Sequence, residues 1–164
     1  MSAEASKADL EREMLRDWEA LAAAVDSFPD AEMEQPGVVD AWSVKDLLGH
    51  IAFWAEKAAE DLQHIADGRP QDVEEPGSEA AVDEWNAREQ AARADKDLSD
   101  VREQWLQSFQ RALDALAAFP AERLQENVKG LTALERFAGD TYEHYREHLE
   151  HLNDWRRQLE TTET

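Results

Sequence analysis

The chain has 164 residues, 42% of them hydrophobic, with a formal net charge of −21 and no cysteine. The charge disfavours phosphate backbones and anionic lipid surfaces as partners, and the lack of cysteine excludes disulfides, thiolate metal ligands and a cysteine nucleophile. No apolar run approaches the roughly 20 residues that span a bilayer and the first residues lack the features of a signal peptide, so we expect one cytoplasmic domain over residues 1–164 that binds neither nucleic acid nor a membrane.

The first predicted element is an amphipathic helix that ends at Pro29. Its apolar residues recur every three or four positions, as on the buried stripe of a helix: Leu10, Met14, Trp18, Leu21, Val25 and Phe28. Ser6 and Asp9 have the spacing of a capping box, which predicts the helix start. A loop with a turn at Pro36-Gly37 follows.

The second predicted helix begins with a capping box of Ser43 and Asp46 and ends before Gly68-Arg69-Pro70. Its buried stripe contains Val44, Leu47, Ile51, Trp54, Ala58, Leu62 and Ile65. His50 shares this stripe, so its side chain needs a polar partner inside the protein. His64 lies about 21 Å farther along the helix axis, and we interpret it as an ordinary surface histidine.

After a linker at 68–77, residues 78–118 show helical periodicity that blurs near 94–98. The pattern fits one broken helix or two helices, and we favour two. Ser78 would cap a short helix, and Ser99 would cap a longer one that ends at Phe119-Pro120.

The last predicted helix follows a linker at 120–130 and begins with a capping box of Thr132 and Glu135. Its apolar stripe runs without a break through Leu131, Leu134, Ala138, Thr141, Tyr145, Leu152 and Leu159. No segment alternates with the period of a strand. The predicted fold is therefore all-α, a four-helix bundle with an additional short helix between the second and third long helices.

Three histidines of the last helix, His144, His148 and His151, are the strongest functional signal. At about 100° per residue, His148 lies about 40° from His144 toward the apolar stripe, and His151 lies about 20° away from it. We therefore expect His144 and His148 to form a pair and His151 to be a surface residue or a neighbour of that pair. Because two imidazoles hold a metal ion weakly, His50 is the third candidate ligand. The alternative is a structural bundle whose histidines make only hydrogen bonds.

The segment Trp42-Ser-Val-Lys-Asp-Leu-Leu-Gly-His50 resembles the W-S-x-x-D-x-x-x-H opening of the second helix in the DinB/YfiT superfamily. The pair His144-x-x-x-His148 lies where those proteins carry their C-terminal HxxxH motif. Pro36-Gly37-Val38, Trp85-Asn86 and His144-Tyr-Arg-Glu-His148 are most similar to the ClbS/DfsB branch. The resemblance covers nearly the whole chain and implies an antiparallel DinB-like bundle. It also implies that His50, His144 and His148 bind a divalent metal ion, Ni or Zn, with one position left for water or substrate.

The resemblance implies two functions for a cleft that takes a small-molecule ligand. The first is a metal-dependent hydrolase or thiol-dependent transferase that acts on a small electrophilic molecule. The alternative is a non-catalytic small-molecule-binding or self-resistance protein without bound metal. A homodimer is expected by family habit. The residues expected to contact the ligand are Trp54, Trp85, Asn86 and Tyr145.

Acidic residues close to the histidines in sequence could assist chemistry at such a site. Glu143 and Glu147 fall on the solvent side of the last helix, so surface charge is their expected role. Asp46 is expected to cap its own helix, and Asp140, one turn before His144, is a further candidate helper.

Overall fold

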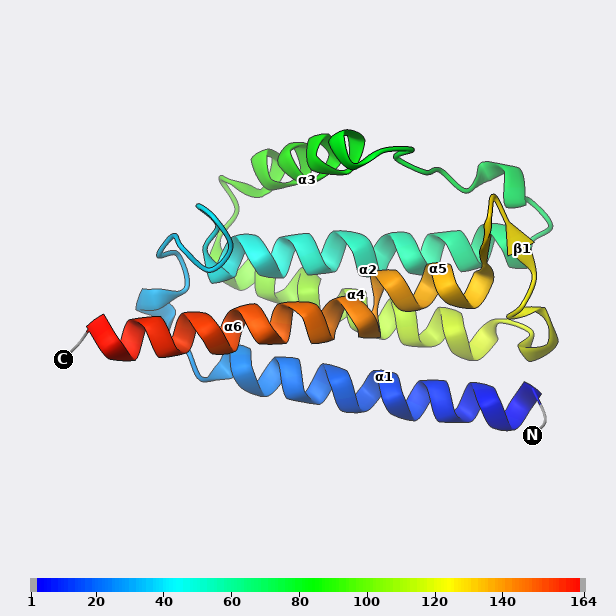
Figure 1. Ribbon diagram of the computed structural model, residues 1–164, viewed down its shortest axis with the longest axis horizontal. Helices are drawn as coiled ribbons and strands as arrows, with labels where there is room; N and C mark the ends of the chain where they lie inside the picture. Colours follow the sequence, from blue (N-terminus) through cyan, green and yellow to red (C-terminus); the bar gives the residue numbers. More distant parts are fainter. Residues whose placement is uncertain (1–2, 163–164) are drawn as a thin grey trace.

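The computed structural model describes residues 3–162, and helices dominate it (Figure 1). Four long helices form the bundle, and their bounds are α1 (Ala3–Asp26), α2 (Val44–Ala66), α4 (Leu98–Ala118) and α6 (Tyr142–Thr162). In Figure 1, α1 and α6 run in one direction and α2 and α4 in the other. The helix α3 (Glu79–Arg93) carries the chain back across α2, which is why α2 and α4 run the same way. The prediction of an all-α bundle with an added short helix is confirmed.

Two of the three predicted capping boxes fix helix starts. The Ser43 hydroxyl accepts a hydrogen bond from Asp46 N at 3.1 Å, and the Ser43 N–H donates to Asp46 Oδ2 at 2.9 Å. Thr132 and Glu135 make the same reciprocal pair at the start of α5 (Ala133–Asp140). The prediction for Ser6 is wrong, because Ser6 lies inside α1 rather than before it.

Residues 78–118 form two helices, as we favoured. Ser78 caps α3 by accepting a hydrogen bond from Ala81 N at 3.1 Å. Ser99 does not cap α4, because that helix already begins at Leu98 and the extended residue before it is Asp97. No residue of α3 is buried, so this helix lies as an outer layer on α2 (Figure 1).

The last predicted helix is broken at Thr141, where α5 ends and α6 begins. Thr141 leaves helical geometry, with φ −123° and ψ −102°, and its hydroxyl donates to the Phe137 carbonyl at 2.7 Å. A short hairpin that the sequence did not predict precedes α5: β1 (Asn127–Val128) pairs antiparallel with β2 (Leu131–Thr132). The turn residues Lys129 and Gly130 both have positive φ, as in hairpin turns of the primed types.

Stacked aromatic rings fill the centre of the bundle. Trp18 stacks on Phe109 with ring centroids 4.4 Å apart, and it contacts Trp105 and Tyr145 at 4.4 and 5.6 Å. These contacts join α1, α4 and α6 and give the rigid frame on which the site is built. Among the described residues, no helix is long and apolar enough to cross a membrane.

Candidate metal centre and ligand cleft

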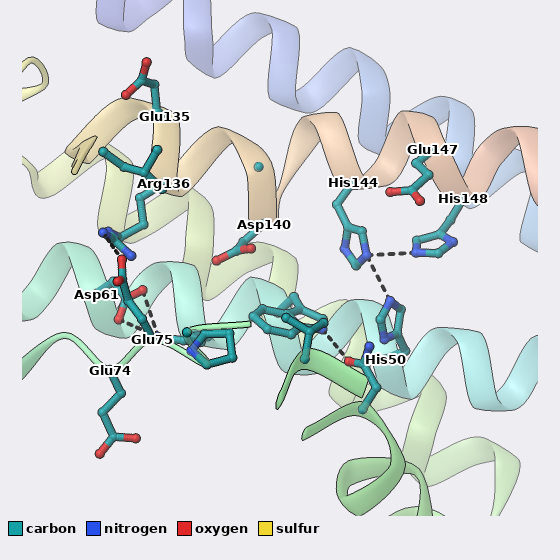
Figure 2. A pocket seen from close by; sticks show the side chains of 18 residues that line it. His50, Asp61, Glu74, Glu75, Glu135, Arg136, Asp140, His144, Glu147 and His148 are labelled. Carbon is teal, nitrogen blue, oxygen red and sulfur yellow. Dashed lines mark hydrogen bonds and ion pairs between the residues drawn. The ribbon is translucent and has the colours of Figure 1, made fainter. Parts of the chain in front are cut away.

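Three imidazoles from two helices converge in the structure. His50 comes from α2, and His144 and His148 come from α6, one turn apart (Figure 2). His144 Nε2 lies 2.9 Å from His50 Nε2 and 2.8 Å from His148 Nε2. We call these three side chains the histidine trio. The structure therefore brings together the three residues that the sequence proposed as metal ligands.

The donor set of the trio fits a metal ion better than it fits hydrogen bonding alone. A proton shared among three converging Nε2 atoms can bridge only one pair at a time. The Nδ1 atoms of His50 and His144 are buried and have no hydrogen-bond partner among the described residues. Three nitrogens held about 2.0–2.1 Å from one tetrahedral ion lie roughly 3.3 Å apart, and the ligand nitrogens of the trio all lie within 4.8 Å of one another.

Burial keeps the trio neutral, which is the form that binds metal ions. Desolvation lowers the pKa of His50 to about 4 and that of His144 to about 3. Desolvation also lowers the pKa of His148, and the neighbouring imidazoles of His144 and His50 lower it further. At neutral pH all three rings therefore present lone pairs rather than positive charges.

A cleft of about 540 Å³ opens beside the trio. Its walls come from α2, the segment 74–77, α3, α5 and the start of α6. Figure 2 shows the trio at one end of this cleft and a group of charged side chains at the other. The volume lies within the range of small-molecule sites, about 300–1,000 Å³.

Comparison with known proteins identifies the family. The family model of the DinB superfamily matches residues 13–158, which is most of the chain. The protein belongs to the DinB superfamily. Among curated proteins, none matches its sequence.

Two solved structures share the fold of this DinB protein. One is an uncharacterised protein from Escherichia coli UTI89, with a TM-score of 0.78 and 15% identity over 94% of each chain. The other is the colibactin self-resistance protein ClbS in complex with double-stranded DNA, with a TM-score of 0.80 and 15% identity. That match covers 92% of this chain and 95% of ClbS. The predicted family and its ClbS-like architecture are thereby confirmed, and at this identity the likeness shows the fold alone.

Two of the four residues expected to contact a ligand line the cleft of this DinB protein, Trp54 and Asn86. The Trp54 indole N–H donates to Asn86 Oδ1 at 2.8 Å, which holds α3 against α2. Trp85 stacks on Trp54 with centroids 6.1 Å apart, but it lines a neighbouring groove. Tyr145 does not reach the cleft: its side chain is fully buried and packs on Trp18, so we assign it to the core.

Of the two other histidines, His151 takes one of its two predicted places, and only His64 differs from its predicted surroundings. His151 is half-buried, and its Nδ1 lies 3.1 Å from Nδ1 of His148, so it is the neighbour of the trio rather than a free surface residue. His64 lies outside the trio as expected, but it is half-buried, with Nε2 3.9 Å from the Glu60 carboxylate.

The charged end of the cleft was not predicted from the sequence. Lys57 Nζ contacts both carboxylate oxygens of Asp61 at 3.0 Å, and Arg136 Nη2 contacts Glu75 Oε1 at 2.6 Å. A signal for the first pair exists, because Asp61 falls on the buried stripe of α2 between Ala58 and Ile65. No comparable signal joins Arg136 to Glu75, which lie in distant parts of the sequence.

The acidic helpers considered from the sequence separate in the structure. Glu147 lines the cleft with an exposed side chain, and Asp46 caps α2. Asp140 lines the cleft between the trio and the charged end (Figure 2). Desolvation, followed by repulsion from Asp61, raises the pKa of Asp140 to about 7.

Proposed function

We propose that this DinB protein captures a small molecule in the cleft beside the histidine trio and protects the cell against it. The observation that carries the proposal is the cleft itself, walled by Trp54 and Asn86 and ended by the trio. The ClbS structure supports the protective role, since a protein of the same fold is a self-resistance protein. We do not extend the DNA ligand of ClbS to this chain, whose charge of −21 opposes duplex binding.

We also propose that His50, His144 and His148 hold one divalent ion, Ni or Zn. A bound ion would supply a dipositive charge that polarises a carbonyl group and favours the ionised form of water or a thiol. The three imidazoles of the trio are neutral, so their lone pairs are available to bind an ion. The contact with His151 orients the ring of His148. Trp54 and Asn86 line the cleft next to His50 and shape its wall.

A metal-dependent hydrolase or thiol-dependent transferase is the second candidate function. The convergence of three neutral imidazoles beside an open cleft favours it. Glu147 and Asp140 line the same cleft and could move protons for a bound molecule. The homodimer that the resemblance implies and the cytoplasmic location expected from the sequence are further proposals, and light scattering in solution would measure the dimer.

Elemental analysis of untagged protein tests the metal site. We expect about one Ni or Zn ion per chain in the wild type and none in His148→Ala, because two imidazoles hold an ion weakly. His64→Ala is the matched control and should keep its metal, since His64 lies outside the trio. Equal metal content in the wild type and His148→Ala would contradict the proposed site.

Turnover experiments separate capture from catalysis. Metal-loaded protein is incubated with para-nitrophenyl acetate, and separately with chlorodinitrobenzene and added cysteine, while native mass spectrometry monitors bound ligand. Capture predicts binding without product release in excess of the protein. Multiple turnovers that disappear in His148→Ala would instead establish the enzyme.

A further inference from the structure

Acidic side chains outnumber basic ones in the lining of the cleft. Its lining contains two basic residues, Lys57 and Arg136, and six acidic ones, Asp61, Glu74, Glu75, Glu135, Asp140 and Glu147. Clefts lined by one sign of charge concentrate ligands of the opposite sign. The excess of carboxylates in this lining therefore favours a cationic ligand.

Both basic residues already have carboxylate partners. Lys57 lies against both oxygens of the buried Asp61, and Arg136 pairs with Glu75 while also donating to the Val128 carbonyl at 2.7 Å. An anionic ligand would have to break one of these pairs and leave a buried charge uncompensated, which is costly. The charged end of the cleft is thus poorly suited to carboxylates and phosphates.

Asp140 has no such partner. Within residues 3–162, no hydrogen bond or ion pair joins its carboxyl to a basic side chain, although Arg136 lies one turn earlier in α5. Figure 2 shows the Asp140 carboxyl between the Asp61 end of the cleft and His144. Partial burial raises its pKa to about 7, which shows how poorly the surroundings compensate its charge.

We propose that the molecule bound in this cleft carries a positively charged nitrogen, an amine or an amidine, and that the Asp140 carboxylate recognises it. The inference rests on the proposed function, because it names the ligand class of the same cleft. A cationic nitrogen would supply the basic partner that the Asp140 carboxyl lacks among the described residues, and its hydrogen bond to a half-buried carboxylate is charge-assisted. The apolar part of the ligand would lie along Trp54 and Val82, and its reactive group would face the trio.

Three probes of nearly equal size and shape test the charge requirement: benzamidine, benzamide and benzoate. Each is titrated into the full-length wild type, Asp140→Asn and Asp26→Asn, with isothermal calorimetry for affinity and the NMR signal of the Trp54 indole N–H to locate binding. Asp26 is exposed at the end of α1 and lies outside the lining of the cleft, so Asp26→Asn controls for the loss of one negative charge.

We expect benzamidine to bind the wild type about tenfold more tightly than benzamide, with benzoate weakest. Asp140→Asn should weaken benzamidine about tenfold and leave benzamide within about threefold, while Asp26→Asn behaves as the wild type. Circular dichroism and metal content of Asp140→Asn, both expected to match the wild type, show that the fold and the trio are intact.

Equal affinity for benzamidine and benzamide, or an Asp140→Asn variant that binds benzamidine as tightly as the wild type, would overturn the inference and leave the cleft as a binding site. Failure of benzamidine to perturb Trp54 would overturn it as well. The metal titration of the trio does not involve Asp140, so it tests that part of the proposed function separately.

Discussion

Tyr145 is a fully buried side chain whose hydroxyl has no hydrogen-bond partner among the described residues. Burial also raises its pKa, because the charged form would be even less well solvated. An unpaired buried polar group costs about 1–3 kcal/mol, so Tyr145→Phe should stabilise the protein by roughly 1 kcal/mol. Urea unfolding measures the difference.

The same variant separates a core role for Tyr145 from a ligand role. Metal content and benzamidine affinity of Tyr145→Phe should equal those of the wild type, since the ring packs on Trp18 outside the cleft. A loss of ligand affinity would return Tyr145 to the site, and a loss of stability would show that its hydroxyl has a partner in solution.

Asp140 makes stability depend on pH in a sense opposite to that of a salt-bridged carboxylate. Its pKa rises from 3.8 to about 7 on folding, so the folded protein keeps a proton that the unfolded chain releases. The free energy of unfolding therefore falls as pH rises from about 4 to about 7. Because asparagine cannot ionise, the stability advantage of Asp140→Asn should grow between about pH 4 and about pH 7 and level off above that.

Urea unfolding of both proteins across this pH range gives the comparison. The lowered pKa values of His50 and His144 make stability fall as pH falls below 6.5, but they do so in both proteins and cancel in the difference. A difference that does not change with pH would show that Asp140 titrates normally.

The histidine trio could be predicted from the sequence because each member carries a local signal. His50 lies in phase with Leu47 and Trp54, and His144 and His148 lie one turn apart on the inner face of their helix. The charged end of the cleft could not be predicted in the same way. Arg136 pairs with Glu75 because the linker after α2 lies against α5. No residue pattern within either segment predicts this ion pair.

At the scale of elements, the helix count followed from periodicity and caps, whereas the break at Thr141 did not. The apolar stripe continues across residue 141, and neither proline nor a capping motif marks the break. At the break, the buried Thr141 hydroxyl bonds to the Phe137 carbonyl four residues earlier, a local hydrogen bond of the kind that bends helices. The break sets the angle between α5, which carries Asp140, and α6, which carries His144.

The helix α3 should be the least protected helix of the protein. None of its residues is buried, and its link to α2 depends largely on Trp54, Trp85 and Asn86. Elements with few buried apolar contacts open at low free energy, so amides of α3 should exchange with deuterium well before those of α2. Hydrogen exchange read by mass spectrometry tests this.

Asn86→Ala should speed exchange in α3 further while global unfolding by urea stays nearly unchanged, because the hydrogen bond to Trp54 lies outside the bundle core. Glu84→Ala is the matched control on the same helix, at an exposed position. Protection of α3 equal to that of α2 would mean that α3 belongs to the cooperative core and that the cleft has a fixed wall.

At the scale of the whole molecule, 38 acidic residues face 17 basic ones. Duplex binding draws most of its affinity from basic side chains that neutralise phosphates and release counterions. The net negative charge of this chain instead repels the phosphates of a duplex. ClbS, which shares its fold, has nevertheless been solved with double-stranded DNA. Two proteins that share a fold at 15% identity need not share the surface charge that binding DNA requires.

We therefore expect no binding of a fluorescein-labelled duplex in anisotropy titrations, even at about 50 mM salt, where attraction to phosphates is strongest. A polylysine peptide, which binds duplexes through charge alone, is the positive control. A saturable rise in anisotropy that weakens as salt increases would contradict the prediction and would require a local basic surface that overcomes the net charge. Its absence, together with a preference of the cleft for benzamidine, would show that the acidity of this chain selects cationic small molecules over nucleic acid.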